Sequence, residues 1–454
     1  MSGVTAVLDI GKTNVKVVTF TGDGALLWER VTPNRVAPGP PYPHADVETI
    51  WDFLLKALAE ANKANEIGAI VATTHGCAAA LVDDSGLVLP VMDYEFAGVD
   101  EIEPFYAPLR PAFSESFSPK LPAGLNLARQ LAWQKRHCAE AFARARTCLT
   151  YPQYWAWRLS GIAAGEVTSL GAHSDLWAPL QRHVSSLVAA LDLRGLMPPL
   201  QPAYRRLAPI KPEIAAATGL GSDVGVLCGV HDSNASLLPH LASRKPPFTI
   251  VSTGTWVILM APGLSVEGLD PADDTLANVD VEGRPVATAR FMGGREYAVI
   301  AGAPASPDAA SLARVVASGA MALPCFAGQG GPFAARKGEI RGPTAHGDLP
   351  ELATLYLALM SDLMLTRLGV TIGDLIVEGS LAANASFCAL LAAFRPSQQV
   401  CAGSDTAGTA RGAALLAQWP PRDFQAPPLI TAPPCDIDGL QSYRSAWSRA
   451  VLET

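Results

Sequence analysis

A polar turn near the start of the chain gathers residue types that bind phosphate and metal ions. It joins two apolar runs, 4–9 and 15–20, and its polar residues are Asp9, Gly11, Lys12, Thr13 and Asn14. Glycine lets a backbone approach a ligand closely, while hydroxyl, amide and ammonium groups are donors that suit phosphate. Asp9, at a strand end, is placed to hold Mg²⁺ through water. The same residue types build ordinary hairpin turns, so this motif alone leaves both interpretations open.

A second turn of related form opens the second half of the chain. Residues 248–252 enter it, residues 256–260 leave it, and it contains Gly254 and Thr255 but no charge. Its hydroxyl and N–H groups could cradle a terminal phosphate with little reorganisation, although a plain turn explains the same sequence. The two strand–turn–strand units form a weak internal repeat. Two donor-rich hairpins predict a nucleotide clamp, even though the glycine-rich P-loop sequence is absent.

A candidate general base follows a third apolar run. His231-Asp232-Ser233-Asn234 comes after the predicted strand 225–230, at the strand end where open α/β sheets present ligands. Asp232 is suited to accept the proton of a substrate hydroxyl during phosphoryl transfer. Aspartate is also a favoured helix N-cap, and both roles are compatible.

A fourth motif, residues 378–384, follows the predicted strand 374–377 and opens a helix. Gly379 would let a base or ribose lie against the backbone, and Asn384 could hydrogen-bond it from the first helical turn. An ordinary strand-to-helix loop explains these residues equally well.

The elements that must position these motifs alternate between strands and helices. The expected strands include 25–30 and 67–74, and the expected helices include one capped by Asp46, helical pattern over 114–146 and 151–159, a short helix from Ala235 limited by Pro239, and helices at 349–368, 384–394 and 406–418. The last begins with small residues, which favours close packing. This alternation predicts an α/β class with two similar halves. We place the domain boundary in 243–247, giving domains 1–242 and 243–454.

Composition limits the classes of function. The 454 residues are 49% hydrophobic and 17% charged, which is enough apolar surface for two or three folded domains. The net charge of -8 argues against a nucleic-acid partner. Glycine, proline and polar residues interrupt the uncharged stretches 248–266 and 315–335, so we expect no membrane partner.

The cysteines and the N-terminal segment indicate the cellular compartment of the protein. The eight cysteines stand singly, without a C-x-x-C pair or zinc-site spacing, and the start lacks a signal-peptide pattern. We expect a cytoplasmic protein with reduced thiols and no structural metal.

Taken in order, the four motifs resemble those of the FGGY carbohydrate kinases. This branch of the actin-like ATPase superfamily includes fuculokinases, rhamnulokinases and xylulokinases. The opening D-x-G-x-T-N-x-K is similar to the family's first phosphate turn, and G-V-H-D-S-N-A to the motif of its catalytic aspartate. S-T-G-T-W is similar to the second phosphate turn, and residues 378–384 to the adenosine motif. Residues 323–328 and 411–414 resemble a Pro- and Gly-containing loop and the closing helix. The resemblance spans nearly the whole chain and depends on order and spacing.

The resemblance implies two ribonuclease-H-like domains and an interdomain cleft that closes before transfer. The first domain would bind the sugar and the second ATP. Asp232 would then be the base, and Asp9 would organise Mg²⁺. The residues implied to bind ATP are Gly11, Lys12, Thr13, Asn14, Gly254, Thr255, Gly379 and Asn384.

Some residues depart from the family pattern. Many members carry a Trp and an Asp with a nearby Arg in the sugar loop, whereas residues 90–96 here contain Asp93 but neither a Trp nor an Arg. Glu378 replaces the first glycine of the usual Gly-Gly pair, and Gln329-Gly330 stands where a Glu-Arg pair is common. Sugar contacts are therefore predicted from strand ends and loops of the first domain, with structural roles equally open: His75, Gly76, Asp93, Tyr94 and Asp232.

The predicted function is ATP-dependent phosphorylation of a small ketose or polyol, with a 6-deoxyketohexose or ketopentose favoured. The alternative is a catalytically weakened sugar- or nucleotide-binding regulatory protein, suggested by Glu378 and Gln329. A repressor would be expected to add a helix-turn-helix and a basic face, and a chaperone-type ATPase a peptide-binding extension. The sequence identifies neither the sugar nor the hydroxyl, and it leaves the oligomeric state open, a homodimer included.

Overall fold

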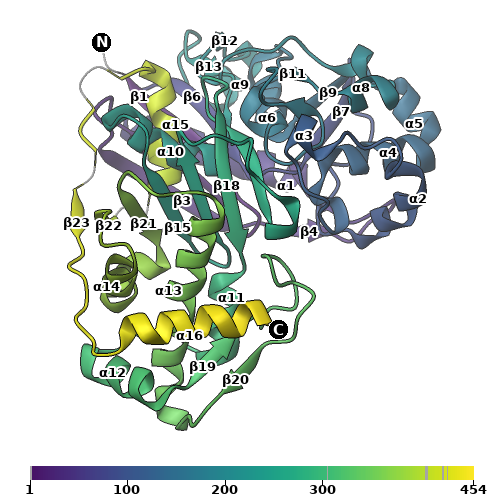
Figure 1. Cartoon of the computed structure of the whole chain (residues 1–454). Helices are drawn as coiled ribbons and strands as arrows, with labels where there is room; N and C mark the ends of the chain where they lie inside the picture. Colours follow the sequence, from purple (N-terminus) through teal and green to yellow (C-terminus); the bar gives the residue numbers. More distant parts are fainter. Residues whose placement is uncertain (1–2, 304, 404–406, 422–423, 427, 454) are drawn as a thin grey trace. The chain divides into compact units, whose positions relative to one another are not determined.

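The computed structural model describes residues 3–303, 305–403, 407–421, 424–426 and 428–453. Contacts divide the chain into two compact units (Figure 1). The first comprises Met1–Arg244, Ala277–Pro285 and Ala407–Ala426, and the second comprises Lys245–Leu276, Val286–Thr406 and Pro427–Thr454. Two segments of the second half of the chain thus belong to the first unit, whereas the sequence-based division assigns them to the second domain.

The main sheet of the first unit is built on the opening hairpin. Strand β1 (Val4–Ile10) pairs antiparallel with β2 (Asn14–Phe20) and parallel with β6 (Ile67–Thr74). Strand β3 (Leu26–Pro33) extends the sheet beyond β2. The predicted opening meander and the strand at 67–74 are confirmed.

The strand predicted at 225–230 is broken in two. Strand β13 (Gly225–Leu227) pairs with the middle of β6, and β14 (Val230–His231) pairs with its end at Thr73 and Thr74. Gly229, between them, has φ +91°, and a Cβ there would lie 2.7 Å from the Ala72 carbonyl oxygen. The break needs glycine, and it brings His231 to the end of β6.

Helices of the first unit confirm one predicted start and correct another. Helix α1 (Val47–Ala64) begins after Asp46, whose carboxylate accepts a hydrogen bond from the Thr49 N–H at 3.1 Å. Helix α10 (Asp232–Ser243) begins three residues earlier than predicted and continues through Pro239, so the prediction that this proline limits the helix is wrong.

Proline is tolerated in α10 beside an unusually close helix. Pro239 lacks the N–H that would bond to the Ala235 carbonyl four residues earlier. Helix α15 (Gly408–Leu415) packs here, and a Cβ on Gly412 would lie 1.9 Å from that carbonyl oxygen. Close packing therefore accounts for the small residues predicted at 406–418. Thr406 lies outside the described residues, and 416–418 form a 3₁₀ turn.

The remaining elements of the first unit form its helical lobe and small sheets. The helical pattern predicted over 114–146 is interrupted by a loop between α3 and α4. These elements are β4 (Val36–Ala37), β5 (His44–Ala45), β7 (Ala79–Asp83), β8 (Gly86–Leu87), α2 (Glu103–Tyr106), α3 (Phe113–Ser116), α4 (Leu127–His137), α5 (Ala139–Arg144), β9 (Thr147–Thr150), α6 (Tyr151–Ser160), α7 (Val167–Leu170), β10 (Trp177–Ala178), β11 (His183–Val184), α8 (Ser186–Ala190), β12 (Arg206–Pro209) and α9 (Pro212–Thr218).

The sheet of the second unit repeats the strand order of the first. Strand β15 (Thr249–Thr253) pairs antiparallel with β16 (Val257–Pro262) and parallel with β21 (Leu375–Gly379). Strand β18 (Pro285–Phe291) follows β16. The predicted internal repeat is confirmed, because each first strand has an antiparallel neighbour from its hairpin and a parallel neighbour from later in the chain.

Helix α13 (Leu349–Arg367) forms the core of the second unit. It packs against α11, α12, α14 and strand β16. By length and composition it could cross a membrane, but 72% of its most apolar window is buried inside the structure, as in a core helix. The helix predicted at 349–368 is confirmed, but burial around most of its circumference replaces the amphipathic pattern expected.

Other elements complete the second unit and its connections. They are β17 (Thr275–Val279), α11 (Gly293–Ala301), α12 (Ala309–Ser318), β19 (Met321–Leu323), β20 (Glu339–Arg341), α14 (Ala385–Phe394), β22 (Val400–Gly403), β23 (Leu429–Thr431) and α16 (Leu440–Glu453).

Candidate active site

Asp9 is a carboxyl group whose surroundings disfavour negative charge. Burial is the largest cause, the neighbouring charge of Asp232 adds to it, and Lys16 opposes it. Together they raise the pKa of Asp9 to about 7. The effect of Asp232 on this pKa indicates that the predicted metal residue and the predicted base lie near each other in the first unit. The described residues hold no cluster of three or more metal-ligating side chains. The candidate ligands for a cation here are therefore the carboxylates of Asp9 and Asp232.

Asp232 is the first residue of α10 and is held by its own neighbours. Its Oδ1 accepts a hydrogen bond from the Ser233 N–H at 2.6 Å and lies 3.2 Å from His231 Nε2. The His231 ring is fixed in turn by Asn234, with Nδ1 and Oδ1 2.6 Å apart. About a third of the Asp232 side chain, 32%, is exposed. The carboxylate is therefore both oriented and accessible.

His75 and Gly76 lie near His231 and Asp232. A Cβ on Gly76 would stand 2.7 Å from His231 Nε2, so only glycine leaves His231 in place. The partly buried His75 ring lies between Tyr94 and Tyr151, with centroid distances of 5.4 and 5.1 Å. Burial lowers the pKa of His75, while its hydrogen bond to the Gly76 carbonyl and the charge of Asp232 partly oppose this. Burial of the ring therefore favours the neutral form of the His75 imidazole.

Lys12 contacts the predicted sugar loop. Its ammonium pairs with the Asp93 carboxylate, lies 3.2 Å from Glu95 Oε2, and stands 4.6 Å from the Tyr94 ring centroid. Three consecutive residues of the loop thus surround this cation. The sequence placed Lys12 with the phosphate-binding residues, but in the structure it joins the first turn to Asp93 and Tyr94.

The first turn is closed by its own backbone and by one residue that the sequence did not single out. The Gly11 N–H donates to the Asn14 carbonyl at 2.9 Å. Asn34 donates through its side-chain amide to the Gly11 carbonyl at 2.7 Å and through its backbone to the Thr13 carbonyl at 2.8 Å. Thr13 and Asn14 are exposed. The turn therefore presents their polar side chains on a braced backbone.

In the second unit, the turn after β15 also exposes its predicted residues. Gly254 and Thr255 are exposed, and the Gly254 N–H donates to the Trp256 carbonyl at 2.9 Å. Helix α11 begins against this turn, since a Cβ on Gly294 would lie 2.0 Å from the Gly254 carbonyl oxygen. The turn is thus supported without any charged side chain of its own.

Gly379 and Asn384 differ in what they can contact. Gly379 has φ +80°, and a Cβ there would lie 1.9 Å from the Thr253 carbonyl oxygen. The buried Asn384 amide accepts from the Phe387 N–H at 3.0 Å and donates to the Ala305 carbonyl at 3.1 Å. The structure thus gives Asn384 a helix-capping role, and its predicted contact with adenosine stays a prediction.

The loop containing Gln329 is anchored by two acidic residues that the sequence gave no reason to select. Buried Glu296 accepts from the Phe326 N–H at 2.9 Å and from the Tyr356 hydroxyl at 2.7 Å. Asp274 accepts from the Gly331 N–H at 2.7 Å. Because their partners are distant in the chain, no local pattern could have identified these anchors.

Comparisons with known proteins place both halves of the chain. Residues 110–239 match the N-terminal domain of the FGGY family of carbohydrate kinases, and residues 245–426 match the carbohydrate kinase FGGY C-terminal domain. The chain is 26% identical over 285 residues to the L-fuculokinase of Escherichia coli (strain K12), a match that covers 58% of this chain and spans only 57% of that protein.

Solved structures agree with these matches. A carbohydrate kinase from Novosphingobium aromaticivorans is 34% identical with a TM-score of 0.92, covering 100% of this chain and 99% of that one. The xylulose kinase from Rhodospirillum rubrum, 19% identical, has a TM-score of 0.80 with 100% and 98% covered, which is a likeness of fold. The predicted fold class, α/β with two domains of the actin-like ATPase type, is confirmed.

Proposed function

The chain belongs to the FGGY family of carbohydrate kinases, and on that premise we propose that it phosphorylates a small ketose or polyol with ATP. A 6-deoxyketohexose or ketopentose is the favoured substrate class, which the similarity to an L-fuculokinase supports. The observation that carries the proposal is the coupling of Asp9 to Asp232 beside His75 and the loop held by Lys12.

Asp232 is the proposed base. Its Oδ1 is engaged by Ser233 and His231, and the described residues offer Oδ2 no hydrogen-bond partner. Oδ2 takes the proton of the acceptor hydroxyl while that oxygen forms a bond to the γ-phosphorus, and the bond to the ADP oxygen breaks. The His75 ring and the Asp93–Tyr94 loop are proposed to position the acceptor.

A magnesium ion fits the surroundings of Asp9. A partly buried carboxyl with a second carboxylate nearby and a pKa of about 7 gains stabilisation from a cation. Mg²⁺ is commonly held by one or two carboxylates together with waters and phosphate oxygens. Asp9 would hold the ion, which when bound neutralises charge on the transferred phosphoryl group.

The two turns are proposed to hold the ATP phosphates. Gly11, Thr13 and Asn14 would contribute from the first unit, and Gly254 and Thr255 from the second. FGGY sugar kinases use ATP as the phosphate donor, and Gly379 leaves a bare backbone for the nucleoside. Oriented backbone and hydroxyl donors of this kind stabilise developing charge without reorganising.

An ADP-release assay tests the proposal. The acceptors are ketopentoses, 6-deoxyketohexoses, pentitols, tetritols and glycerol, and the product is identified as a phosphate ester. Asp232→Asn should reduce kcat by about 10²–10⁴-fold, whereas Asp52→Asn, an exposed residue of α1, should not. ATP hydrolysis without a phosphorylated product across the panel would instead support the regulatory alternative, and normal turnover by Asp232→Asn would refute the assignment of the base.

A further inference from the structure

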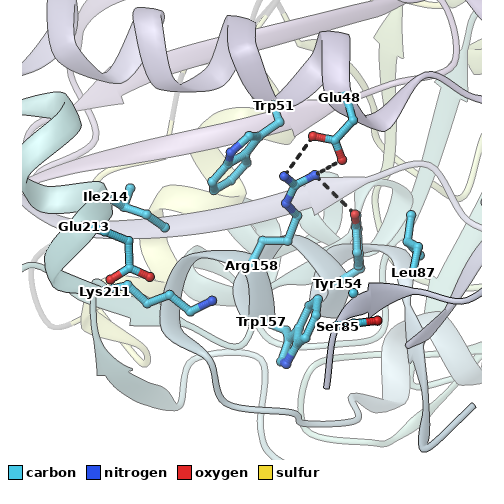
Figure 2. Close-up of a pocket in the computed structure, with 11 residues that line it drawn as sticks. Glu48, Trp51, Ser85, Leu87, Tyr154, Trp157, Arg158, Lys211, Glu213 and Ile214 are labelled. Carbon is cyan, nitrogen blue, oxygen red and sulfur yellow. Dashed lines mark hydrogen bonds and ion pairs between the residues drawn. The ribbon is translucent and has the colours of Figure 1, made fainter. Parts of the chain in front are cut away.

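An open cavity of about 510 Å³ lies in the first unit, apart from the candidate active site (Figure 2). Its walls come from the start of α1, the second half of α6, the start of α9 and the turn between β7 and β8. Asp9, Lys12, His75 and Asp232 do not line it. Its volume lies within the roughly 300–1,000 Å³ of small-molecule sites, so a ligand of one or two sugar rings would fit.

Aromatic residues form much of the wall. Tyr154 and Trp157, three residues apart on α6, stack with ring centroids 6.1 Å apart. Trp51 on α1 stacks on the buried Trp155 at 6.3 Å. Trp51 and Trp157 are themselves partly exposed. Rings fixed by such stacking present apolar surface with little conformational freedom to lose on binding.

Charged side chains of both signs stand among these rings. The Arg158 guanidinium lies 4.3 Å from the Trp51 ring centroid and 2.9 Å from Glu48 Oε1. Figure 2 shows Arg158 between Glu48 and Tyr154, with the Lys211 side chain reaching into the cavity from the opposite wall. The Lys211 ammonium is 5.6 Å from the Trp157 ring centroid, and no described residue forms an ion pair with it. Glu213 is exposed beside it.

This lining selects among ligand classes. Arg158 and Lys211 carry two positive charges, and Glu48 and Glu213 carry two negative charges, so the lining has no formal excess that would favour a phosphate or a nucleotide. The charged groups disfavour a lipid, because burying them against a chain would leave them unsolvated. Donors and acceptors beside ring faces suit a molecule with several hydroxyls and an apolar face.

We propose that this cavity is a second carbohydrate-binding site, which takes a neutral mono- or disaccharide and is separate from the site of phosphoryl transfer. Carboxylates of Glu48 and Glu213 accept hydrogen bonds from sugar hydroxyls, the Lys211 ammonium donates to them, and the indole of Trp157 covers the apolar face. The proposal uses no residue of the catalytic site and stands whether or not the proposed phosphorylation is correct.

Binding without ATP tests the proposal. The probes are xylitol, D-xylose and maltose, followed by tryptophan fluorescence and saturation-transfer NMR, with glucose 6-phosphate as the charged counterpart. We expect saturable binding of at least one neutral probe. Its Kd should rise about tenfold in Lys211→Gln and in Trp157→Leu, while kcat and KM measured on a substrate of the enzyme stay within twofold of wild type.

Matched variants separate binding from folding. Lys63→Gln, an exposed lysine of α1 outside the cavity, should leave the Kd unchanged. If Trp157→Leu lowers the Tm, Lys211→Gln still tests the site, because Lys211 is partly exposed. The proposal is overturned if no neutral probe binds, if the Kd is the same in wild type and Lys211→Gln, or if glucose 6-phosphate binds more tightly than every neutral probe.

Discussion

The hairpins β1–β2 and β15–β16 share a topology but differ in chemistry. Each has a first strand that pairs antiparallel with its successor and parallel with a later strand, β6 in one unit and β21 in the other. The first turn contains Asp9 and Lys12, and Lys16 lies opposite Asp9 in the register. The second turn offers only hydroxyl groups and backbone.

This difference indicates a division of labour within one architecture. The first unit holds the groups proposed to exchange a proton and to attract a cation, Asp232 and Asp9, which lie close enough for the charge of Asp232 to raise the pKa of Asp9. The second unit holds fixed dipoles, supported by the close backbone contact of Gly379 with Thr253. Four predictions test this contrast between charged groups in the first unit and fixed dipoles in the second. They are given in order of decreasing effect.

The largest effect should follow from removing the charge of Asp9, which belongs to the first of the two turns. Asp9→Asn should lower kcat by about 10²–10³-fold, because it removes the carboxylate proposed to hold Mg²⁺. Thr255→Ala in the second turn should lower it only about tenfold, since one hydroxyl is lost while the backbone donors remain. Steady-state kinetics over a range of Mg²⁺ concentrations measures both. Equal losses in the two variants would contradict the proposed division.

The next effect concerns the stability of the second unit. Gly379→Ala should lower the free energy of unfolding by roughly 2–4 kcal/mol, because the new Cβ meets the Thr253 carbonyl oxygen at a positive φ. Gly254→Ala is the matched control, since its nearest neighbour would be 4.0 Å away, and it should change stability by less than about 1 kcal/mol. Urea unfolding of both variants checks the contrast, which fails if the two lose stability equally.

A smaller effect should arise from the support of the base. Buried Glu166 accepts a hydrogen bond from the Thr168 N–H at 2.9 Å and a second from the Thr168 hydroxyl, whose oxygen accepts from the His231 N–H at 3.0 Å. Thr168→Val removes this link next to Asp232 and should lower kcat about tenfold, the equivalent of ~1.4 kcal/mol. Thr168→Ser keeps the hydroxyl and should restore kcat, with the KM for ATP unchanged in both. If Ser and Val behave alike, the link does not position the base.

The smallest effect concerns pH. The pKa of Asp9 rises from its ordinary 3.8 to about 7 and that of Glu166 from 4.5 to about 7, so between these values the native state retains protons that the unfolded state has lost. The contribution of these two groups to the stability of the first unit is therefore greatest below about pH 4, and it is lost as the pH rises through 7. Both groups belong to the first unit.

Hydrogen exchange between pH 5 and pH 8, corrected for intrinsic rates, checks this difference. Protection should fall in β1 and β6 by an amount on the order of 1–2 kcal/mol, and should change less in β15 and β21. Asp9→Asn should remove its share of the pH dependence. A uniform change in both sheets, or an unchanged slope in Asp9→Asn, would contradict the prediction.

Local patterns explain what the sequence could predict. The hairpins, the helix capped by Asp46 and the base at the start of α10 each depend on residues a few positions apart. Contacts across long separations left no such signal: Lys12 meets Asp93 81 residues later, and Thr168 meets His231 63 residues later. The break at Gly229 was missed because its cause is the Ala72 carbonyl of a neighbouring strand. Asn384 was ambiguous because an amide that suits a nucleoside also suits a helix cap.

The close contact of Gly412 with Ala235 has a consequence for biosynthesis. The core between β1, β2 and α10 includes Ala410, Ala413 and Ala414 of α15. The core of the first unit is therefore complete only after these residues have been translated, and they follow nearly all of the second unit. A nascent chain that ends at Arg244 exposes the apolar side of α10 that α15 later covers. Such surface is prone to aggregation. The second unit must therefore emerge while the first is still open along one side, which couples the folding of the two units in time even though each has its own sheet.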